Sequence, residues 1–309
     1  MDVRNVMRAE LPVELRAAPA FELLVSLYAE EERELWLHLL GLALELEAES
    51  AAAWLRRVER VPADELRLHV LGAYVPAWRQ VAGGETIERA AAGDPAAAEA
   101  LLANDRYYAG NAAASLADLL PLDAAQTRAV LLARLDAHAH AFALRERDVM
   151  AELLADIEAK RGVAGYELVD RTAGGYRYET EAGFERVVLV PHLAARPSLL
   201  LCQHRTTRLI LYPAARAGGD ERLVALGRAL ADEKRLAILK RLRSGDATLG
   251  ELAAELGLAK STTHHHLGRL RAAGLIVLAG NAQGYRYALE PAAFGEAGSL
   301  IAGFAGRSL

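Results

Sequence analysis

Apolar residues recur every three or four positions from about Pro12 to Arg161, in a stretch rich in Ala, Leu and Glu. This spacing places them on one face of a helix, so the stretch predicts six or seven amphipathic helices, the last running from about Ala124 to Lys160. Asp94 and Asp123 have the residue type and position of helix N-caps. Helix breakers mark the expected boundaries at Val61-Pro62, Gly83-Gly84, Gly93-Asp94-Pro95 and Pro121-Leu122-Asp123.

After Gly162 the pattern changes to β-branched and aromatic residues between glycines, which is typical of short strands. Gly174-Gly175 and Ala182-Gly183 have the composition of hairpin turns, so we expect a small antiparallel β-meander. A cluster of Pro and Gly then indicates a linker at 214–220. The expected strands are Tyr166 to Arg171, Tyr176 to Thr180, Arg186 to Val190, Leu199 to Gln203 and Arg208 to Tyr212.

The last 90 residues predict a second domain, made of helices followed by two strands. Helices are expected at Glu221 to Leu230 and at Asp232 to Arg243, and Thr248 opens a third. Gly257 allows a sharp turn before a fourth helix from Lys260 to Ala273. The fold class is therefore α+β, mainly α: a helical and β-meander domain at 1–213, a linker at 214–220 and a C-terminal domain at 221–309. Its two strands, Leu275 to Ala279 and Tyr285 to Leu289, flank a five-residue hairpin loop at 280–284.

The segment from Thr248 to Ile276, TLGELAAELGLAKSTTHHHLGRLRAAGLI, resembles the helix-turn-helix of ArsR-type winged-helix transcriptional regulators. The preceding stretch from Ala231 to Leu239 and the predicted hairpin that follows are also similar to that family. The resemblance covers roughly the last 90 residues, and it implies a DNA-binding transcriptional regulator with repression as its default action. The arrangement as a whole resembles a subgroup whose long N-terminal domain has no assigned chemistry.

Polar residues form one stripe along the predicted helix from Lys260 to Ala273. Ser261, His264, His265 and Gly268 share a face, because residues three, four and seven apart lie above one another on a helix. A helix in the DNA major groove needs such a hydrogen-bonding face. Ser261 and His264 or His265 are therefore the expected contacts to base edges. The expected contacts to phosphates are Lys260, Thr262 and Arg269, and those of the wing are Gln283 at its tip and Arg286 on its returning strand.

A single winged helix makes few phosphate contacts, so we expect a homodimer on double-stranded DNA with two half-sites. The candidate dimer surfaces are Glu221 to Leu230 and Ala292 to Phe304. A small-molecule effector or partner at the N-terminal domain would act by shifting the separation of the two recognition helices. The alternative is a protein-interaction module, in which the winged helix docks another protein and never touches DNA.

Metal sensing does not follow from the resemblance. The family's sensors often carry Cys-x-Cys at the start of the first helix of the helix-turn-helix, where this chain has Thr248 and Gly250. Cys202 and His204 would share a face of a strand, but two ligands are too few for a structural zinc site. The three consecutive histidines at 264–266 diverge by about 100° per residue on a helix. We therefore predict no metal and no cofactor.

Enzymatic activity is not indicated either, because the chain lacks the common nucleophile, phosphate-binding and metalloprotease motifs. The scattered aromatics of the N-terminal region, such as Trp36, Trp54, Trp78 and Tyr107, are typical of a helical core. The alternative is that some of them line a pocket between helices.

Composition limits the setting in which such a protein works. The 309 residues are 53% hydrophobic and 25% charged, which excludes wholesale disorder and predicts about two domains. The net charge of −5 conceals an asymmetry: residues 220–309 hold 12 Lys and Arg against 9 Asp and Glu, and the rest of the chain is acidic. One cysteine, no leader-like N-terminus and no apolar run long enough for a membrane span favour the cytoplasm.

Overall fold

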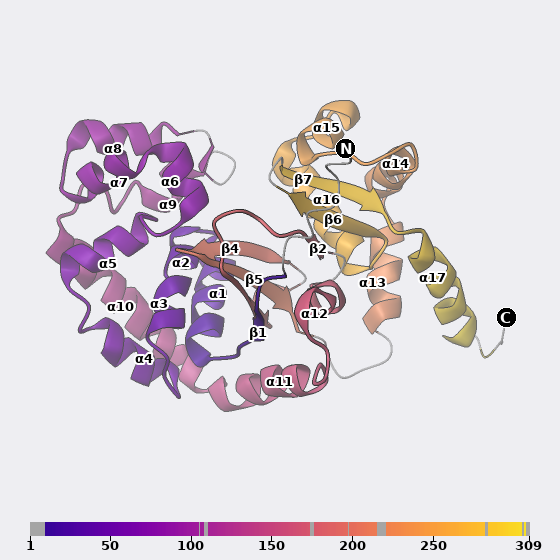
Figure 1. Cartoon of the computed structure of the whole chain (residues 1–309), viewed down its shortest axis with the longest axis horizontal. Coiled ribbons are helices and arrows are strands. Elements are labelled where there is room, and N and C mark those ends of the chain that lie inside the picture. Colours follow the sequence, from indigo (N-terminus) through magenta and orange to yellow (C-terminus); the bar gives the residue numbers. More distant parts are fainter. Residues whose placement is uncertain are drawn as a thin grey trace, which may run out of the picture.

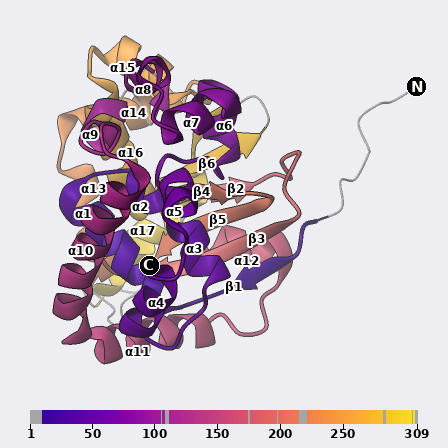
Figure 2. The same ribbon diagram turned by 90° about the vertical axis from the view of Figure 1, so that its left-hand side faces the viewer.

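The N-terminal region is helical, as its periodicity predicts. In the computed structural model, residues 10–104, 106–107, 111–173, 176–196, 198–214, 221–281, 284–304 and 306 are described. The helices of this region wrap one face of a small sheet (Figure 1, Figure 2). They are α1 (Pro19–Glu31), α2 (Leu35–His38), α3 (Leu40–Glu45), α4 (Ala51–Val58), α5 (Ala63–Val70), α6 (Pro76–Ala82), α7 (Gly84–Ala91), α8 (Pro95–Leu102), α9 (Ala112–Leu116), α10 (Ala124–Ala143) and α11 (Glu146–Glu158).

The two predicted N-caps are confirmed. Asp94 accepts hydrogen bonds from the backbone N–H groups of Ala96 and Ala97, at 2.9 and 3.2 Å, and so begins α8. Asp123 forms a capping box with Gln126 at the start of α10. Both caps satisfy backbone donors that the first helical turn leaves without a partner.

The helices are shorter and more numerous than the six or seven that the periodicity predicts. The single helix expected from Ala124 to Lys160 is two helices, α10 and α11, which meet at Leu144 and Arg145. No Pro or Gly marks this break in the sequence. The change of direction brings α11 into contact with the sheet, so tertiary packing decided it and no local signal did.

The predicted antiparallel meander is wrong in its topology. The sheet has the order β1-β3-β5-β4, in which β1, β3 and β5 are parallel and only β4 pairs antiparallel with β5. A strand from the start of the chain thus joins strands far along it, which turn residues cannot reveal. The strands are β1 (Val13–Leu15), β3 (Arg186–His192), β4 (Leu200–His204) and β5 (Thr207–Pro213).

Two further expectations for 166–183 are corrected. The segment predicted as a strand from Tyr166 to Arg171 is helix α12 (Gly165–Thr172), whose buried residues Leu168, Val169 and Thr172 have helical spacing. Strand β2 (Tyr176–Tyr178) pairs in parallel with a strand of the C-terminal domain. Since β2 and β3 therefore lie in different sheets, Ala182-Gly183 does not close a hairpin. The other expected turn, Gly174-Gly175, and most of the expected linker, 215–220, lie outside the described residues.

The C-terminal domain has the predicted winged helix-turn-helix fold. A three-stranded sheet of order β2-β6-β7 completes it, with β6 and β7 as the antiparallel wing. The elements follow the expected ranges to within a few residues. They are α13 (Glu221–Leu230), α14 (Glu233–Leu242), α15 (Leu249–Leu256), α16 (Lys260–Ala272), β6 (Ile276–Asn281), β7 (Gly284–Leu289) and α17 (Pro291–Phe304).

Two hydrophobic cores meet at the first sheet. One lies between the helices α1–α11 and the sheet face that carries Val188, Val190 and Leu209. The other begins on the opposite face, with Ile210 and Tyr212, and continues without interruption into the winged helix. The expected division at residue 213 therefore cuts through the second core. None of the described helices is both long enough and apolar enough to cross a membrane.

Buried histidines make the stability of the folded chain depend on pH. His38 is 2% exposed, its Nδ1–H donates to the carbonyl of Val70 at 2.7 Å, and burial lowers its pKa to about 4. Between pH 4 and the unfolded value near 6.5 the unfolded chain binds more protons, so stability rises with pH in this window. We expect His38 alone to lower the free energy of unfolding by about 2 kcal/mol at pH 5 relative to neutral pH.

Thermal unfolding followed by circular dichroism between pH 5 and 7.5 measures this effect. His38→Gln is expected to flatten the dependence on pH, whatever it does to stability at pH 7.5. His140→Gln, at an exposed position of α10, is the matched control and should keep the wild-type slope. An equal dependence of stability on pH in both variants would show that His38 is not a source of the pH dependence.

Candidate nucleic-acid interface

The helix-turn-helix is set by two local signals at the ends of α15. Thr248 and Glu251 form a reciprocal capping box: the backbone N–H of Glu251 donates to Thr248 Oγ1 at 3.2 Å, and that of Thr248 donates to Glu251 Oε2 at 2.7 Å. The Thr248 backbone N–H lowers the pKa of the Glu251 carboxyl. Gly257 ends the helix with φ of 63°, a left-handed conformation that glycine adopts without strain. The chain thereby turns sharply into α16.

Helix α16 has one buried face. Thr263, Leu267 and Leu270 are at most 1% exposed and belong to the face that packs into the domain. Thr263 Oγ1 donates to the carbonyl of Ala259 at 3.0 Å, so its hydroxyl is satisfied within the helix. These three residues are the ones that the sequence predicts to point inward, and the structure confirms them.

The opposite face of α16 is polar and exposed. Ser261, His264 and His265 form the exposed stripe that the spacing predicts, and the exposed Lys260 and Thr262 lie on either side of it. Arg269, half-buried one turn later, donates from Nε to His265 Nε2 at 3.0 Å. Because His265 accepts on Nε2, its Nδ1 carries the proton and is the ring atom that can donate outward. The predicted base-contacting and phosphate-contacting residues of α16 are thus brought together on one surface.

His266 does not belong to this surface. Its side chain is 12% exposed and faces Asp232, the N-cap of α14, with 3.8 Å between Nδ1 and Oδ1. Burial lowers the pKa of His266, and the Asp232 carboxylate opposes that shift. The third histidine of the run therefore joins α16 to α14, while the first two remain exposed.

The wing differs from its expected arrangement. Arg286 lies on β7, and its Nη2 donates to the carbonyl of Asp246 at 2.6 Å and lies 3.3 Å from Glu251 Oε2. The guanidinium is thus held at the start of α15, beside the helix-turn-helix. Gln283, expected at the tip, lies outside the described residues.

The sequence-based interpretation missed how the wing meets the rest of the chain. Tyr285 on β7 stacks obliquely with Tyr176 on β2, with 6.4 Å between the ring centroids. Arg271, which looks like another basic residue of α16, is 9% exposed, and burial lowers its pKa to about 10. The only sequence signal for the β2 contact is the alternation of Tyr176 and Tyr178, which is equally typical of any short strand.

Neither the Cys202–His204 pair nor the histidine run at 264–266 belongs to a group of ligands that could hold a metal ion, among the described residues. Cys202 and His204 do lie on one face of β4, both buried, but His204 Nε2 contacts Glu45 Oε1 at 2.7 Å. Burial raises the pKa of the Cys202 thiol to about 12, which disfavours the thiolate that binds metals. Among the described residues, no three His, Cys, Asp or Glu side chains are grouped so that they could hold an ion.

Comparison with known proteins identifies the family that the C-terminal domain resembles. Residues 232–277 match the family described as bacterial regulatory protein, arsR family. The HTH-type transcriptional regulators CmtR of Mycobacterium bovis and of Mycobacterium tuberculosis are 46% identical to this chain over 70 residues, which are 23% of this chain. The matched segment spans 59% of the length of those curated relatives.

Two solved structures are also similar. NolR from Sinorhizobium fredii is 29% identical, with a TM-score of 0.23 over 28% of this chain and 88% of that chain. HlyU from Vibrio cholerae is 30% identical, with a TM-score of 0.23 over 29% of this chain and 97% of that chain. The assignment depends on the family match and on the α14–β6 geometry, in which a capped helix, a glycine turn and a second helix precede the wing. The segment 232–277 is therefore a winged helix-turn-helix domain of the bacterial ArsR regulatory family.

Proposed function

We propose that the chain is a DNA-binding transcriptional regulator, with α16 in the major groove and repression as its default action. The observation that carries this proposal is the exposed polar stripe of Ser261, His264 and His265, away from the buried face of α16. Hydroxyl and imidazole groups can donate to and accept from base edges, and Lys260 at the start of the stripe can neutralise a phosphate.

A homodimer is supported by α13 and α17, which pack against each other at the edge of the winged helix (Figure 1). Although α17 has 14 residues, none of them is buried. Val224 on α13 is 48% exposed, and three apolar side chains on α17 are exposed as well. They are Phe294, Ile301 and Phe304, at 40%, 50% and 72% exposure. An unpartnered apolar surface of this kind fits a second copy of the chain, as DNA with two half-sites requires.

The N-terminal helices would carry the regulatory input of such a protein in the cytoplasm. Their core is continuous with the first sheet, and the opposite face of that sheet packs on the winged helix. A change in the helical region can therefore reach the DNA-binding domain through the sheet, which suits an effector-controlled population shift.

The proposal is tested by fluorescence anisotropy of the full chain with DNA from upstream of its own gene and with a scrambled duplex, over a salt series. Lys260→Ala should weaken binding to both duplexes by the same factor. It should also reduce the slope of log affinity against log salt concentration by about 1. His265→Ala should cost about 1–3 kcal/mol on the specific duplex only. Arg56→Ala, on the distant helix α4, should change neither.

Equal losses on both duplexes for His265→Ala would contradict its role in reading bases. Absence of DNA binding, together with salt-insensitive association with another protein, would instead identify a protein-interaction module.

A further inference from the structure

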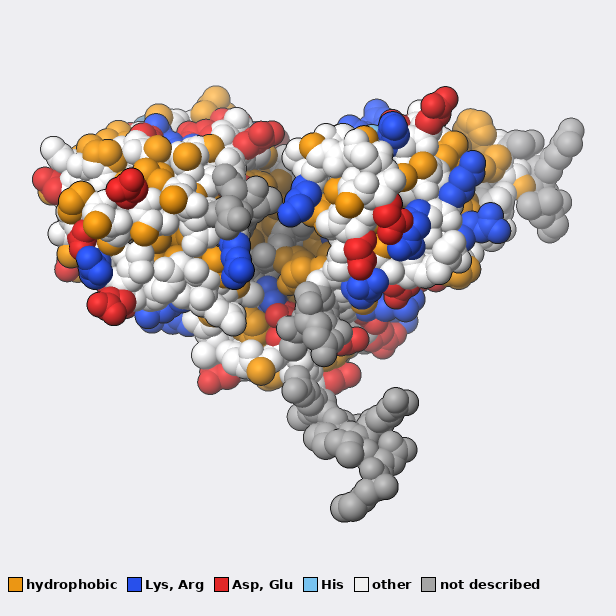
Figure 3. Space-filling view, turned by 90° about the horizontal axis from the view of Figure 1, so that it is seen from above, with side chains coloured by type: hydrophobic (Ala, Val, Ile, Leu, Met, Phe, Trp, Pro, Cys, Tyr) orange, Lys and Arg blue, Asp and Glu red, His pale blue; other side chains and the backbone are white. Residues whose placement is uncertain are grey.

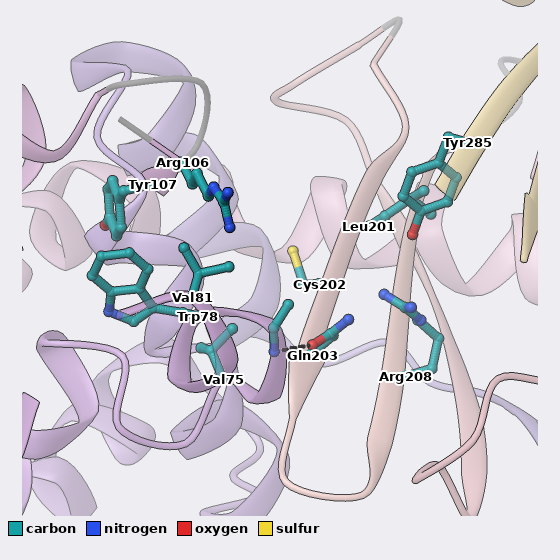
Figure 4. A pocket seen from close by; sticks show the side chains of 11 residues that line it. Val75, Trp78, Val81, Arg106, Tyr107, Leu201, Cys202, Gln203, Arg208 and Tyr285 are labelled. Atoms are coloured by element: carbon teal, nitrogen blue, oxygen red, sulfur yellow. Dashed lines mark hydrogen bonds between the residues drawn. The ribbon is translucent and has the colours of Figure 1, made fainter. Parts of the chain in front are cut away.

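A pocket of about 250 Å³ lies between the helical region and the wing, away from the exposed face of α16. In the space-filling view the surface is hollowed between the helical lobe and the winged-helix lobe (Figure 3). Residues from α6, from β4 and β5, and from β7 line it, so three parts of the fold meet there (Figure 4). Its volume is below the roughly 300–1,000 Å³ of pockets for drug-sized ligands, so its occupant would be smaller than a typical drug.

One side of the pocket is an apolar wall with fixed geometry. The rings of Trp78 and Tyr107 meet edge to face, 4.6 Å apart, and both side chains are buried. Trp78 Nε1 donates to the carbonyl of Leu71 at 3.0 Å, which orients its ring. Val75 and Val81 extend this wall (Figure 4). Flat apolar surface of this kind favours an aromatic group.

The other side offers hydrogen-bond donors. Arg208 is 1% exposed and forms an ion pair with Glu181, yet its Nε has no hydrogen-bond partner among the described residues. Gln203 Oε1 accepts from the backbone of Ala77 at 2.8 Å, which leaves its amide NH₂ to donate. Arg106 lies beside Tyr107, on the same side as the apolar wall, and forms no ion pair with a described residue (Figure 4).

These groups define the charge of the occupant. None of the described lining residues is Asp or Glu, and Glu181 already balances one of the two arginines. Among the described residues, no carboxylate balances Arg106, and this cation beside an apolar wall suits a single negative charge on an otherwise apolar molecule. A carboxylate can accept hydrogen bonds from the N–H donors that line both sides of the pocket.

We propose that this pocket binds a small aromatic carboxylate and that its occupancy changes the DNA affinity of the winged helix. The second part rests on the proposed function, whereas the first does not. Coupling follows from Tyr285, which lines the pocket and lies on β7. The next residue, Arg286, contacts the start of α15 through Asp246 and Glu251. A ligand that displaces Tyr285 therefore acts directly on the strand that holds the helix-turn-helix.

Calorimetric titration of the full chain with benzoate, salicylate, 2-naphthoate and indole-3-acetate, each beside its neutral amide, tests binding. At least one carboxylate should bind, and its amide should bind at least about tenfold more weakly. Arg106→Gln removes the cation, and Val81→Trp fills the pocket. Each variant should weaken binding of the carboxylate by about tenfold or more. Both positions are exposed, so the fold should tolerate these changes.

Arg56→Gln is the matched control, because it removes an exposed arginine on α4 and should leave the affinity unchanged. No binding of any of the four carboxylates at millimolar concentration would overturn the proposal. An unchanged affinity in both pocket variants would also overturn it.

Anisotropy with specific DNA, with and without the carboxylate that binds, tests the coupling. We expect a change in Kd of about fivefold or more, absent in Val81→Trp. A bound carboxylate that leaves the DNA affinity unchanged would overturn the coupling. A chain that binds the carboxylate but no DNA would overturn the proposed function and leave the pocket assignment standing.

Discussion

Ile301→Glu in α17 is expected to convert the proposed dimer to monomers and to weaken binding to specific DNA by about 10²- to 10⁴-fold, because two linked half-site contacts become one. Ile301 is 50% exposed, and Phe294 lies on the same face of the helix two turns before it. A buried carboxylate at the centre of an apolar interface has no partner and is strongly unfavourable. The change leaves the folded monomer intact, since no residue of α17 is buried in it.

Sedimentation velocity measures the oligomeric state, and anisotropy measures the affinity for DNA. Ser299→Glu is the matched control: it adds the same charge to α17, but about 200° around the helix from Ile301. It should leave both the dimer and the affinity unchanged. A dimeric Ile301→Glu variant with wild-type affinity would exclude α17 as the dimer surface.

Arg67→Met is expected to destabilise the helical region by about 3–5 kcal/mol, because several buried carbonyls lose their donor at about 1–3 kcal/mol each. Arg67 on α5 is 1% exposed, and burial lowers its pKa. Its guanidinium donates to a set of backbone carbonyls and to one hydroxyl, and so joins α5 to the end of α7, to the segment after α9 and to the start of α10. The acceptors are the carbonyls of Ala90, Ala91, Leu119, Leu120 and Asp123, and Thr127 Oγ1.

Methionine keeps much of the volume of Arg67 but donates no hydrogen bond, so the loss would come from the carbonyls left without a donor. Urea unfolding followed by circular dichroism measures the change. Arg56→Met, at an exposed position of α4, should stay within about 0.5 kcal/mol of the wild type. A loss for Arg67→Met as small as that would show that the carbonyls find other donors.

The candidate interface was largely predictable because its signals are local. A capping box at Thr248 and Glu251, a glycine at 257 and a three-to-four spacing of apolar residues each act within one or two helical turns. Once α16 forms, its buried face decides which residues remain exposed, so Ser261, His264 and His265 could be assigned without coordinates. The side-chain partners of Arg286 could not, because they depend on where β7 lies relative to α15.

The N-terminal region was predicted less well for the same physical reason. Its helical character follows from periodicity, but the break at Leu144 follows from contact of α11 with the sheet. The segment from Tyr166 to Arg171 shows how a short apolar run is ambiguous between strand and helix until packing decides. Arg67 carries no local signal at all, since its partners are backbone carbonyls far along the chain.

By itself, the sequence determined that this chain is mainly helical, that it ends in a winged helix-turn-helix and which residues of α16 face outward, because helix periodicity and capping depend on residues a few positions apart. Only the tertiary structure decided the parallel order β1-β3-β5, the pairing of β2 with β6 and the pocket beneath Tyr285. The pairs β1–β3 and β2–β6 and the pocket join residues more than 100 positions apart, and β3 pairs with β5 across the intervening strand β4. Burial of the two sheet faces selects these pairings, and no local preference does.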